Sequence, residues 1–104
     1  MFEPTTRYIT SGINQRLPEE IQRMLWISID ARILFEKEKV DYLQVFTFKK
    51  LEDNVLAIYH EQEQPQLRNV HYTGYREEYK DFIDDKVYII DDETHSTMLF
   101  AYEY

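Results

Sequence analysis

The densest group of residues with chemical potential lies near the carboxyl terminus, where three carboxylates and an imidazole occur within five positions. They are Asp91, Asp92, Glu93 and His95. Hard cations such as Ca²⁺ and Mg²⁺ take oxygen ligands, so these residue types suit a divalent-cation site. The segment lacks the alternating aspartates, the glycine and the distal glutamate of a calcium-binding loop. The pattern therefore favours a hairpin turn in which aspartates bond their own backbone, and we predict neither a metal nor a cofactor.

The histidines and one serine offer two other kinds of catalytic site. His60, His71 and His95 are widely separated and lack the i, i+4 spacing of a helical zinc site. Ser96 follows His95, but neighbouring residues of a strand point to opposite faces, so His95 is badly placed to activate that hydroxyl. We predict no catalytic residues. The alternative is a small metal-dependent or acid–base enzyme, which requires His60 and His95 to meet in a concave pocket beside carboxylates.

The acidic residues are unevenly distributed along the chain, whose formal net charge is −8. Residues 52–104 hold 13 carboxylates and 4 basic side chains, whereas residues 1–51 hold 7 and 8. Such a surface repels phosphates, so we predict no direct nucleic-acid binding and expect a basic protein partner. The acidic residues predicted to contact this partner are Asp84, Asp85, Asp91, Asp92 and Glu93. The alternative is a surface that only keeps the protein soluble.

Length and composition predict one domain over residues 1–104, because 104 residues with 43% hydrophobic content suffice for one small core. There are no cysteines, which excludes disulfides and fits a reducing compartment. The first seven residues do not resemble a signal peptide, and no apolar run approaches the ~20 residues of a membrane span. We therefore expect a cytoplasmic protein without membrane contact.

A long helix is the clearest predicted element, running from Pro18 to about Glu38. Proline suits the first turn, and no glycine interrupts the segment. Because the polar stripe is narrow, the helix is either deeply seated among sheet and loops or carries a partner surface at Trp26 and Leu34. A homodimer through this flank is a further expectation. The residues predicted to share one broad face are Ile21, Met24, Leu25, Ser28, Ile29 and Phe35.

After the helix the pattern changes to runs of β-forming residues. The ranges predicted as strands are 8–10, 41–48, 55–60, 70–73, 87–90 and 97–102. A polar, proline-containing loop is expected at 61–66, and a short helix or irregular segment at 75–83. The predicted fold class is α+β, with one long N-terminal helix packed on a mostly antiparallel β-sheet of four to six strands.

Five stretches from end to end of the chain carry a family resemblance. They are Thr5-Thr6-Arg7-Tyr8-Ile9-Thr10 with Gly12, Pro18 through Ile21-Gln22 to Leu25-Trp26 and Ile29-Asp30, Asp41-Tyr42-Leu43-Gln44-Val45-Phe46, His60 with Gln62-Glu63 and Pro65, and Ile90-Asp91-Asp92 through His95-Ser96-Thr97-Met98-Leu99 to Glu103-Tyr104. In these the chain resembles the small bacterial family called domain of unknown function 960. The resemblance implies an α+β domain from Gram-positive bacteria or their mobile elements, with no assigned activity, cofactor or site. Residues 66–86 are least like the family pattern.

Together these patterns predict a non-enzymatic protein-binding module with an acidic C-terminal surface. Trp26 and Leu34 are the predicted apolar anchors, since buried aromatic and apolar side chains often dominate the binding energy.

Overall fold

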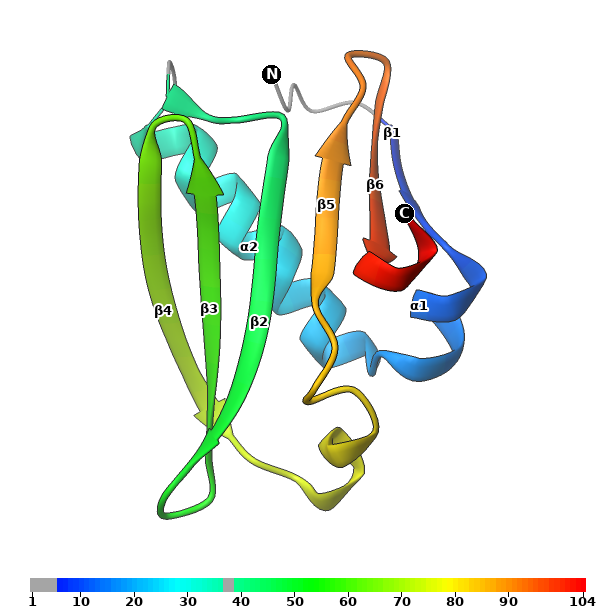
Figure 1. The fold of residues 1–104 in the computed structure, drawn as a ribbon, viewed down its shortest axis with the longest axis vertical. Coiled ribbons are helices and arrows are strands. Elements are labelled where there is room, and N and C mark those ends of the chain that lie inside the picture. The colour runs from blue at the N-terminus through cyan, green and yellow to red at the C-terminus, as the bar shows by residue number, and fades with distance from the viewer. Residues whose placement is uncertain (1–5, 37–38) are drawn as a thin grey trace.

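The computed structural model describes residues 6–36 and 39–104. It confirms the predicted α+β class, with one long helix on a mostly antiparallel six-stranded sheet (Figure 1). The strands are β1 (Thr6–Ile9), β2 (Leu43–Leu51), β3 (Val55–Glu63), β4 (Gln66–Gly74), β5 (Val87–Asp91) and β6 (His95–Phe100). Their order across the sheet is β1-β6-β5-β2-β3-β4. The β1–β6 pair is parallel, and the other pairs are antiparallel.

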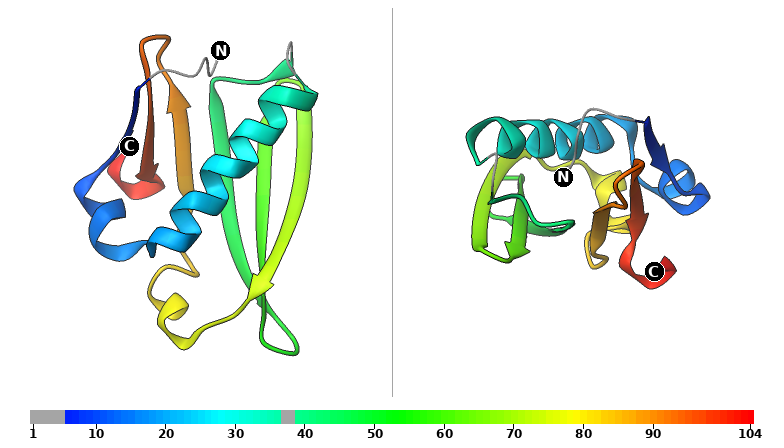
Figure 2. Two further views of the ribbon diagram at one scale, coloured as in Figure 1. Left: turned by 180° about the vertical axis from the view of Figure 1, so that it is seen from behind. Right: turned by 90° about the horizontal axis from the view of Figure 1, so that it is seen from above.

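The long helix α2 (Glu19–Phe35) crosses one face of the sheet, as the views from behind and from above show (Figure 2). It starts directly after Pro18, with Glu19 and Glu20 in its first turn, where carboxylates favour the positive end of the helix dipole. The predicted extension to Glu38 lies outside the described residues. No helix in the described part of the chain is both long and apolar enough to cross a bilayer.

Shorter helical segments in the described part of the chain include α1 (Ser11–Arg16) and the 3₁₀ helices η2 (Glu77–Asp81) and η3 (Ala101–Glu103). The sequence analysis missed α1, although its capping signal is local. The hydroxyl of Thr10 accepts a hydrogen bond from the amide of Ile13 at 3.2 Å, as an N-cap residue does. The segment 75–83, expected as either a short helix or an irregular segment, contains the 3₁₀ helix η2, with Tyr79 and Phe82 buried against the core.

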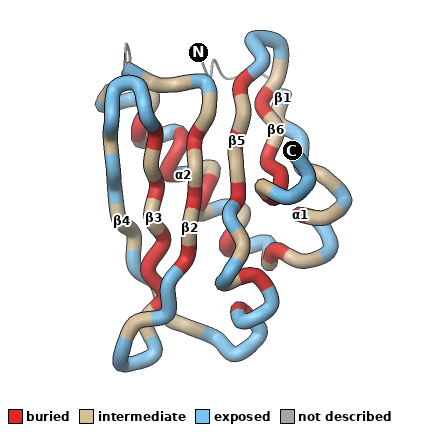
Figure 3. Tube along the Cα trace, viewed as in Figure 1, coloured by how far each residue is buried: buried red, intermediate tan, exposed pale blue. Residues whose placement is uncertain are grey.

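The core lies between α2 and the sheet, as the buried segments in Figure 3 show. Alternate residues of the central strands point to the helix, because successive side chains of a strand face opposite sides. The largest fully buried side chains are Phe46, Phe82, Phe100, Ile13, Ile21, Leu25, Ile29, Leu56, Ile58, Ile89 and Met98.

The predicted buried face of the helix is wrong at one residue, Phe35. Phe35 was expected in the core, but its side chain is 77% exposed, whereas Arg32 is only 3% exposed. At 100° per residue Phe35 lies on the same side of α2 as Met24 and Ser28. That flank overhangs β4, the last strand of the sheet, so no further strand covers it.

The polar segment 61–66 also differs from the predicted loop. β3 continues to Glu63 and β4 begins at Gln66, so only Gln64 and Pro65 form the turn. Hydrogen bonding between neighbouring strands thus outweighs the low β-propensity of this segment. β4 becomes nine residues long, where a four-residue strand was predicted.

We expect Ile29→Ala to lower the free energy of unfolding by about 2–5 kcal/mol, because it empties space at the centre of the α2–sheet contact. The matched change Leu34→Ala lies on the same helix at a side chain that is 68% exposed. It is expected to cost at most about 0.5–1 kcal/mol. Chemical denaturation of both variants measures the difference. Equal losses would show that α2 packs on the sheet through another face.

Candidate binding groove between α2 and β4

A layer of polar side chains lies between the C-terminal half of α2 and strands β2, β3 and β4. Its members, called the polar layer below, are Ser28, Arg32, Gln44, His60, Gln62, Asn69 and His71. Five of them are buried, while His71 is half-buried and Asn69 is exposed. The members on strands face the helix because successive side chains of a strand point to opposite sides, and the register places His60 opposite Asn69.

The direction of each hydrogen bond in the polar layer follows from Arg32, which can only donate. Its Nη1 lies 2.9 Å from Oε1 of Gln44, which is therefore an acceptor. His60 Nε2 lies 2.6 Å from the same oxygen and must carry a proton. With His60 neutral, its Nδ1 accepts from the hydroxyl of Ser28 at 2.6 Å. Ser28 has then used its hydrogen, so Nε2 of His71 donates to Oγ at 2.8 Å.

Both histidines are held neutral by their surroundings. Burial, followed by the nearby charge of Arg32, lowers the pKa of His60 to about 2. The same two causes, in the same order, lower the pKa of His71. A low-dielectric environment disfavours the charged imidazolium, and the neighbouring guanidinium repels it.

Ser28, His60 and Gln44 have the connectivity of a nucleophile, a base and an orienting group. A general base works best when its pKa lies near the working pH, and that of His60 is far below neutrality. His71 also donates to Ser28 rather than accepting its proton. The geometry therefore favours a structural and ligand-facing role for these residues over activation of the hydroxyl.

An apolar flank of α2 lies beside the polar layer. Ile27 is 64% exposed, and the exposed Leu34 and Phe35 follow it toward the end of the helix. Two cavities of about 110 and 130 Å³ lie along this flank, and both are bordered by Ala31 of α2 and His71 of β4. Because β4 ends the sheet, its outer edge has no neighbouring strand in the described part of the chain. We call this region the α2–β4 groove.

A larger hollow of about 480 Å³ lies on the sheet face away from α2, with Leu43, Val45 and Tyr88 among its lining residues. Its rim carries Glu61 and Glu63. Among the described residues, however, the buried side-chain polar atom without a hydrogen-bond partner is Nε of Arg32, a residue that borders the cavity of about 110 Å³ in the α2–β4 groove. Unpaired buried donors are rare and call for an explanation, which favours the groove over the larger hollow as the candidate site.

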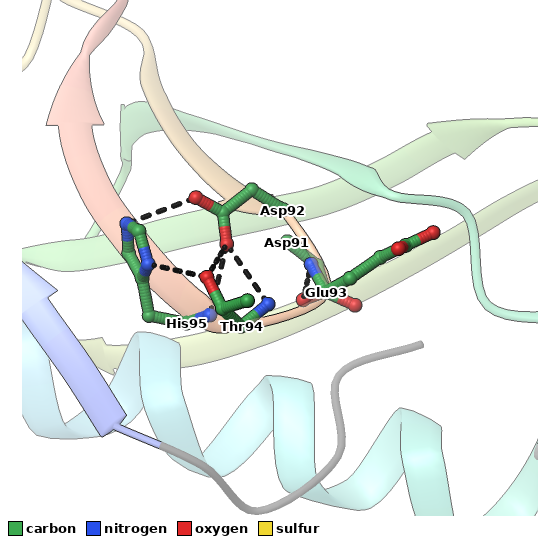
Figure 4. Close-up of polar contacts among 5 residues, drawn as sticks. All are labelled: Asp91, Asp92, Glu93, Thr94 and His95. Carbon is green, nitrogen blue, oxygen red and sulfur yellow. Dashed lines mark hydrogen bonds and ion pairs between the residues drawn. The ribbon is translucent and has the colours of Figure 1, made fainter.

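The acidic segment that precedes β6 folds back on itself (Figure 4). Oδ1 of Asp92 accepts hydrogen bonds from the amides of Thr94 and His95 at 3.1 and 2.8 Å. Oδ2 of Asp92 lies 3.0 Å from Nε2 of His95. Oδ1 of Asp91 accepts from the amide of Glu93 at 3.0 Å. The backbone bonds, that from His95 first, lower the pKa of Asp92. Three or more metal-ligating side chains do not gather anywhere in the described residues.

The predicted acidic contact residues fall into two separate groups. Asp84 and Asp85 precede β5, whereas Asp91 is its last residue and Asp92 and Glu93 follow it, so the groups lie at opposite ends of the strand (Figure 1). Asp85 forms an ion pair with Arg16 at 2.8 Å. The fold thus does not bring the five residues together, and their role in partner binding stays a prediction.

The two predicted apolar anchors lie on opposite flanks of α2. The guanidinium of Arg7 lies over the ring of Trp26, 4.7 Å from its centroid, and Trp26 packs against the core. Leu34 lies on the exposed flank that borders the α2–β4 groove. Of the two, Leu34 is therefore the accessible one.

The structure separates His60 from His95. His60 faces α2 from β3, while His95 pairs with Asp92 at the start of β6, with Tyr8 against its ring. Ser96 is buried and, as predicted, lies on the other face of its strand from His95. Sequence reasoning missed the meeting of His60 and His71 at Ser28. The only local signal was a serine on an otherwise apolar helix face.

Comparisons with known proteins agree with this fold. A family model described as "Staphylococcal protein of unknown function (DUF960)" matches residues 6–103. The crystal structure of a protein of unknown function from Enterococcus faecalis aligns with a TM-score of 0.77 at 21% sequence identity, covering 100% of this chain and 98% of that chain. At that identity the likeness shows the fold alone. No curated protein matches the sequence.

The polar layer predicts a loss of stability in mild acid. Folded His60 stays neutral down to about pH 2, whereas an unfolded histidine takes up a proton near 6.5. Between these two pH values the unfolded state therefore binds more protons than the folded state. Lowering the pH through this range decreases the free energy of unfolding by up to about 1.4 kcal/mol per pH unit for each such histidine. Denaturation between pH 7.5 and about 5 avoids most of the carboxylate titration. A flat profile, or NMR evidence that folded His60 is protonated near pH 6, would contradict the proposed bond directions.

Proposed function

The chain belongs to the DUF960 family of staphylococcal proteins of unknown function, and we propose that it is a non-enzymatic protein-binding module. Its recognition site is the α2–β4 groove, which accepts an extended segment of a partner protein. The segment adds to the outer edge of β4 and packs its alternate side chains against α2. The observation that carries the proposal is the exposed apolar flank of α2 beside the edge strand β4, whose outer side pairs with no other strand among the described residues.

Both parts of the groove are needed for this mode of binding. An edge strand offers backbone donors and acceptors to an added strand, and neighbouring pockets then select its side chains. The cavities beside Ala31 supply such pockets, while Ile27 and Leu34 supply apolar contact area. Extended chains match a nine-residue edge strand in length and in hydrogen-bonding pattern.

The acidic surface has a different part in the proposal. Asp84 precedes β5 and Glu93 follows it, so the acidic residues do not form one cluster, but the net charge of −8 acts at a distance. Charge of one sign accelerates encounter with an oppositely charged partner and affects the tightness of the complex less. A basic partner is therefore attracted by the whole protein and recognised at the groove.

The enzymatic alternative has one observation in its favour, the chain of hydrogen bonds from Ser28 through His60 to Gln44. The strongly lowered pKa of His60 opposes it, as does the placement of His95 on a different strand and against Asp92. We therefore rank it second.

Affinity selection from random nine-residue peptides, half with free and half with amidated C-termini, tests the groove. We expect selected peptides with alternating apolar residues, and at least about tenfold weaker binding to Leu34→Asp, because that change places a charge in the contact. Tyr8→Asp is the matched control, since Tyr8 is also an exposed apolar side chain but lies on β1. Selection of no peptide, or equal losses in both variants, would overturn the proposal. A mass that rises to that of a dimer, with Leu34→Asp restoring the monomer, would instead assign the groove to a second copy.

The role of charge is tested with a selected peptide that carries lysine or arginine. We expect Asp84→Asn combined with Glu93→Gln to slow association a few-fold at low salt while dissociation stays unchanged. Stopped-flow kinetics at two ionic strengths separate the two rates. A faster dissociation rate would show that these acidic residues contact the partner directly.

A further inference from the structure

The guanidinium of Arg32 is buried, and no carboxylate of residues 6–36 or 39–104 is bonded to it. Its Nη1 donates to Gln44, and its Nη2 donates to the carbonyl of His60 at 3.2 Å and to Asn69. Its Nε–H finds no acceptor in the described part of the protein. A buried cation is stabilised best by an opposite charge, and here all the bonded acceptors are neutral. The site is therefore electrostatically suited to an anion.

The two cavities of the α2–β4 groove differ in chemistry. The cavity of about 110 Å³ is bordered by Arg32 and by Asn69, Glu36 and Phe35. The cavity of about 130 Å³ is instead bordered by apolar side chains, Met24, Ile27 and Ile58. Ser28, Ala31 and His71 border both cavities, so the two adjoin. A ligand that fills both must carry a polar group and an apolar group on neighbouring atoms.

We infer that the two cavities bind a carboxylate and an apolar side chain carried by one residue, the C-terminal residue of the partner segment. The carboxylate lies in the cavity that Arg32 borders, where the charge of the guanidinium attracts it, and the side chain enters the apolar cavity. A C-terminal residue bears both groups on the same Cα, as the adjoining cavities require. An internal Asp or Glu brings its carboxylate on a side chain, which leaves the apolar cavity unfilled. The inference rests on the proposed function, because the residues that precede the terminus pair with β4.

Glu36 bears on this inference because its negative charge borders the same cavity. It lies at the end of α2, where it is partly exposed and solvent weakens its repulsion. Arg32 is almost fully buried, so its attraction is weakened less. Removing the charge of Glu36 should therefore strengthen carboxylate binding, which a variant that merely unfolds cannot do.

The test compares N-acetyl-leucine with N-acetyl-leucinamide, two probes that differ only in the charged terminus. In ¹⁵N NMR titrations we expect the acid to bind with a millimolar Kd, as suits so small a ligand, and to shift the Arg32 Nε–H and the Ala31 amide. The amide should bind at least about tenfold more weakly. Glu36→Gln should tighten the acid about threefold and leave the amide unchanged.

A second variant tests the location. Ala31→Leu extends a side chain from the wall that both cavities share, at a helix position that favours leucine, and should abolish binding of the acid. Equal affinities for acid and amide, or no response of Glu36→Gln, would overturn the carboxylate site even if peptides are selected. If the acid binds as expected but no peptide does, the proposed peptide-binding function is wrong. The carboxylate would then not come from the C-terminus of a partner protein.

Discussion

Arg32 is a buried side chain that only donates hydrogen bonds, and the arrangement around it depends on this single constraint. Gln44 has to turn its oxygen to the guanidinium, which leaves its amide nitrogen to donate to Gln62 at 2.8 Å. His60 is then restricted to one tautomer, and Ser28 to one hydroxyl direction. Each partner is satisfied only in one arrangement, so sliding or rotation of α2 over the sheet would leave buried polar groups unpaired.

The same constraint holds the chain segments around the groove. The amide nitrogen of Gln44 also donates to the carbonyl of Asp41 at 2.8 Å, and that of Gln62 donates to the carbonyl of Pro65 at 3.0 Å. These bonds fix the approach to β2 and the turn between β3 and β4. The edge strand β4 is therefore set against α2 by a rigid polar layer, and preorganised sites lose less free energy to ordering when a ligand binds.

The groove exists because β4 is the last strand of the sheet and, among the described residues, no further strand covers the adjacent flank of α2. The helix is apolar on most of its circumference, and on the other flank Arg7 and the core cover Trp26. On the β4 flank Ile27, Leu34 and Phe35 stay exposed. A further strand at this edge would bury them and would pair the backbone of β4, which is the physical basis for proposing an extended partner segment.

The sequence by itself determined α2 and the approximate place of each strand, but not α1 or the short turn between β3 and β4. Hydrophobic spacing located α2 and the strands, and the aspartates before His95 indicated a self-bonded turn, because these signals act over a few residues. Only the tertiary structure decided the site. Ser28 meets His60 and His71 across 32 and 43 residues, and Phe35 becomes exposed because β4 is the last strand. Strand order and the contacts between distant residues follow from the packing of the whole chain, and no local pattern encodes them.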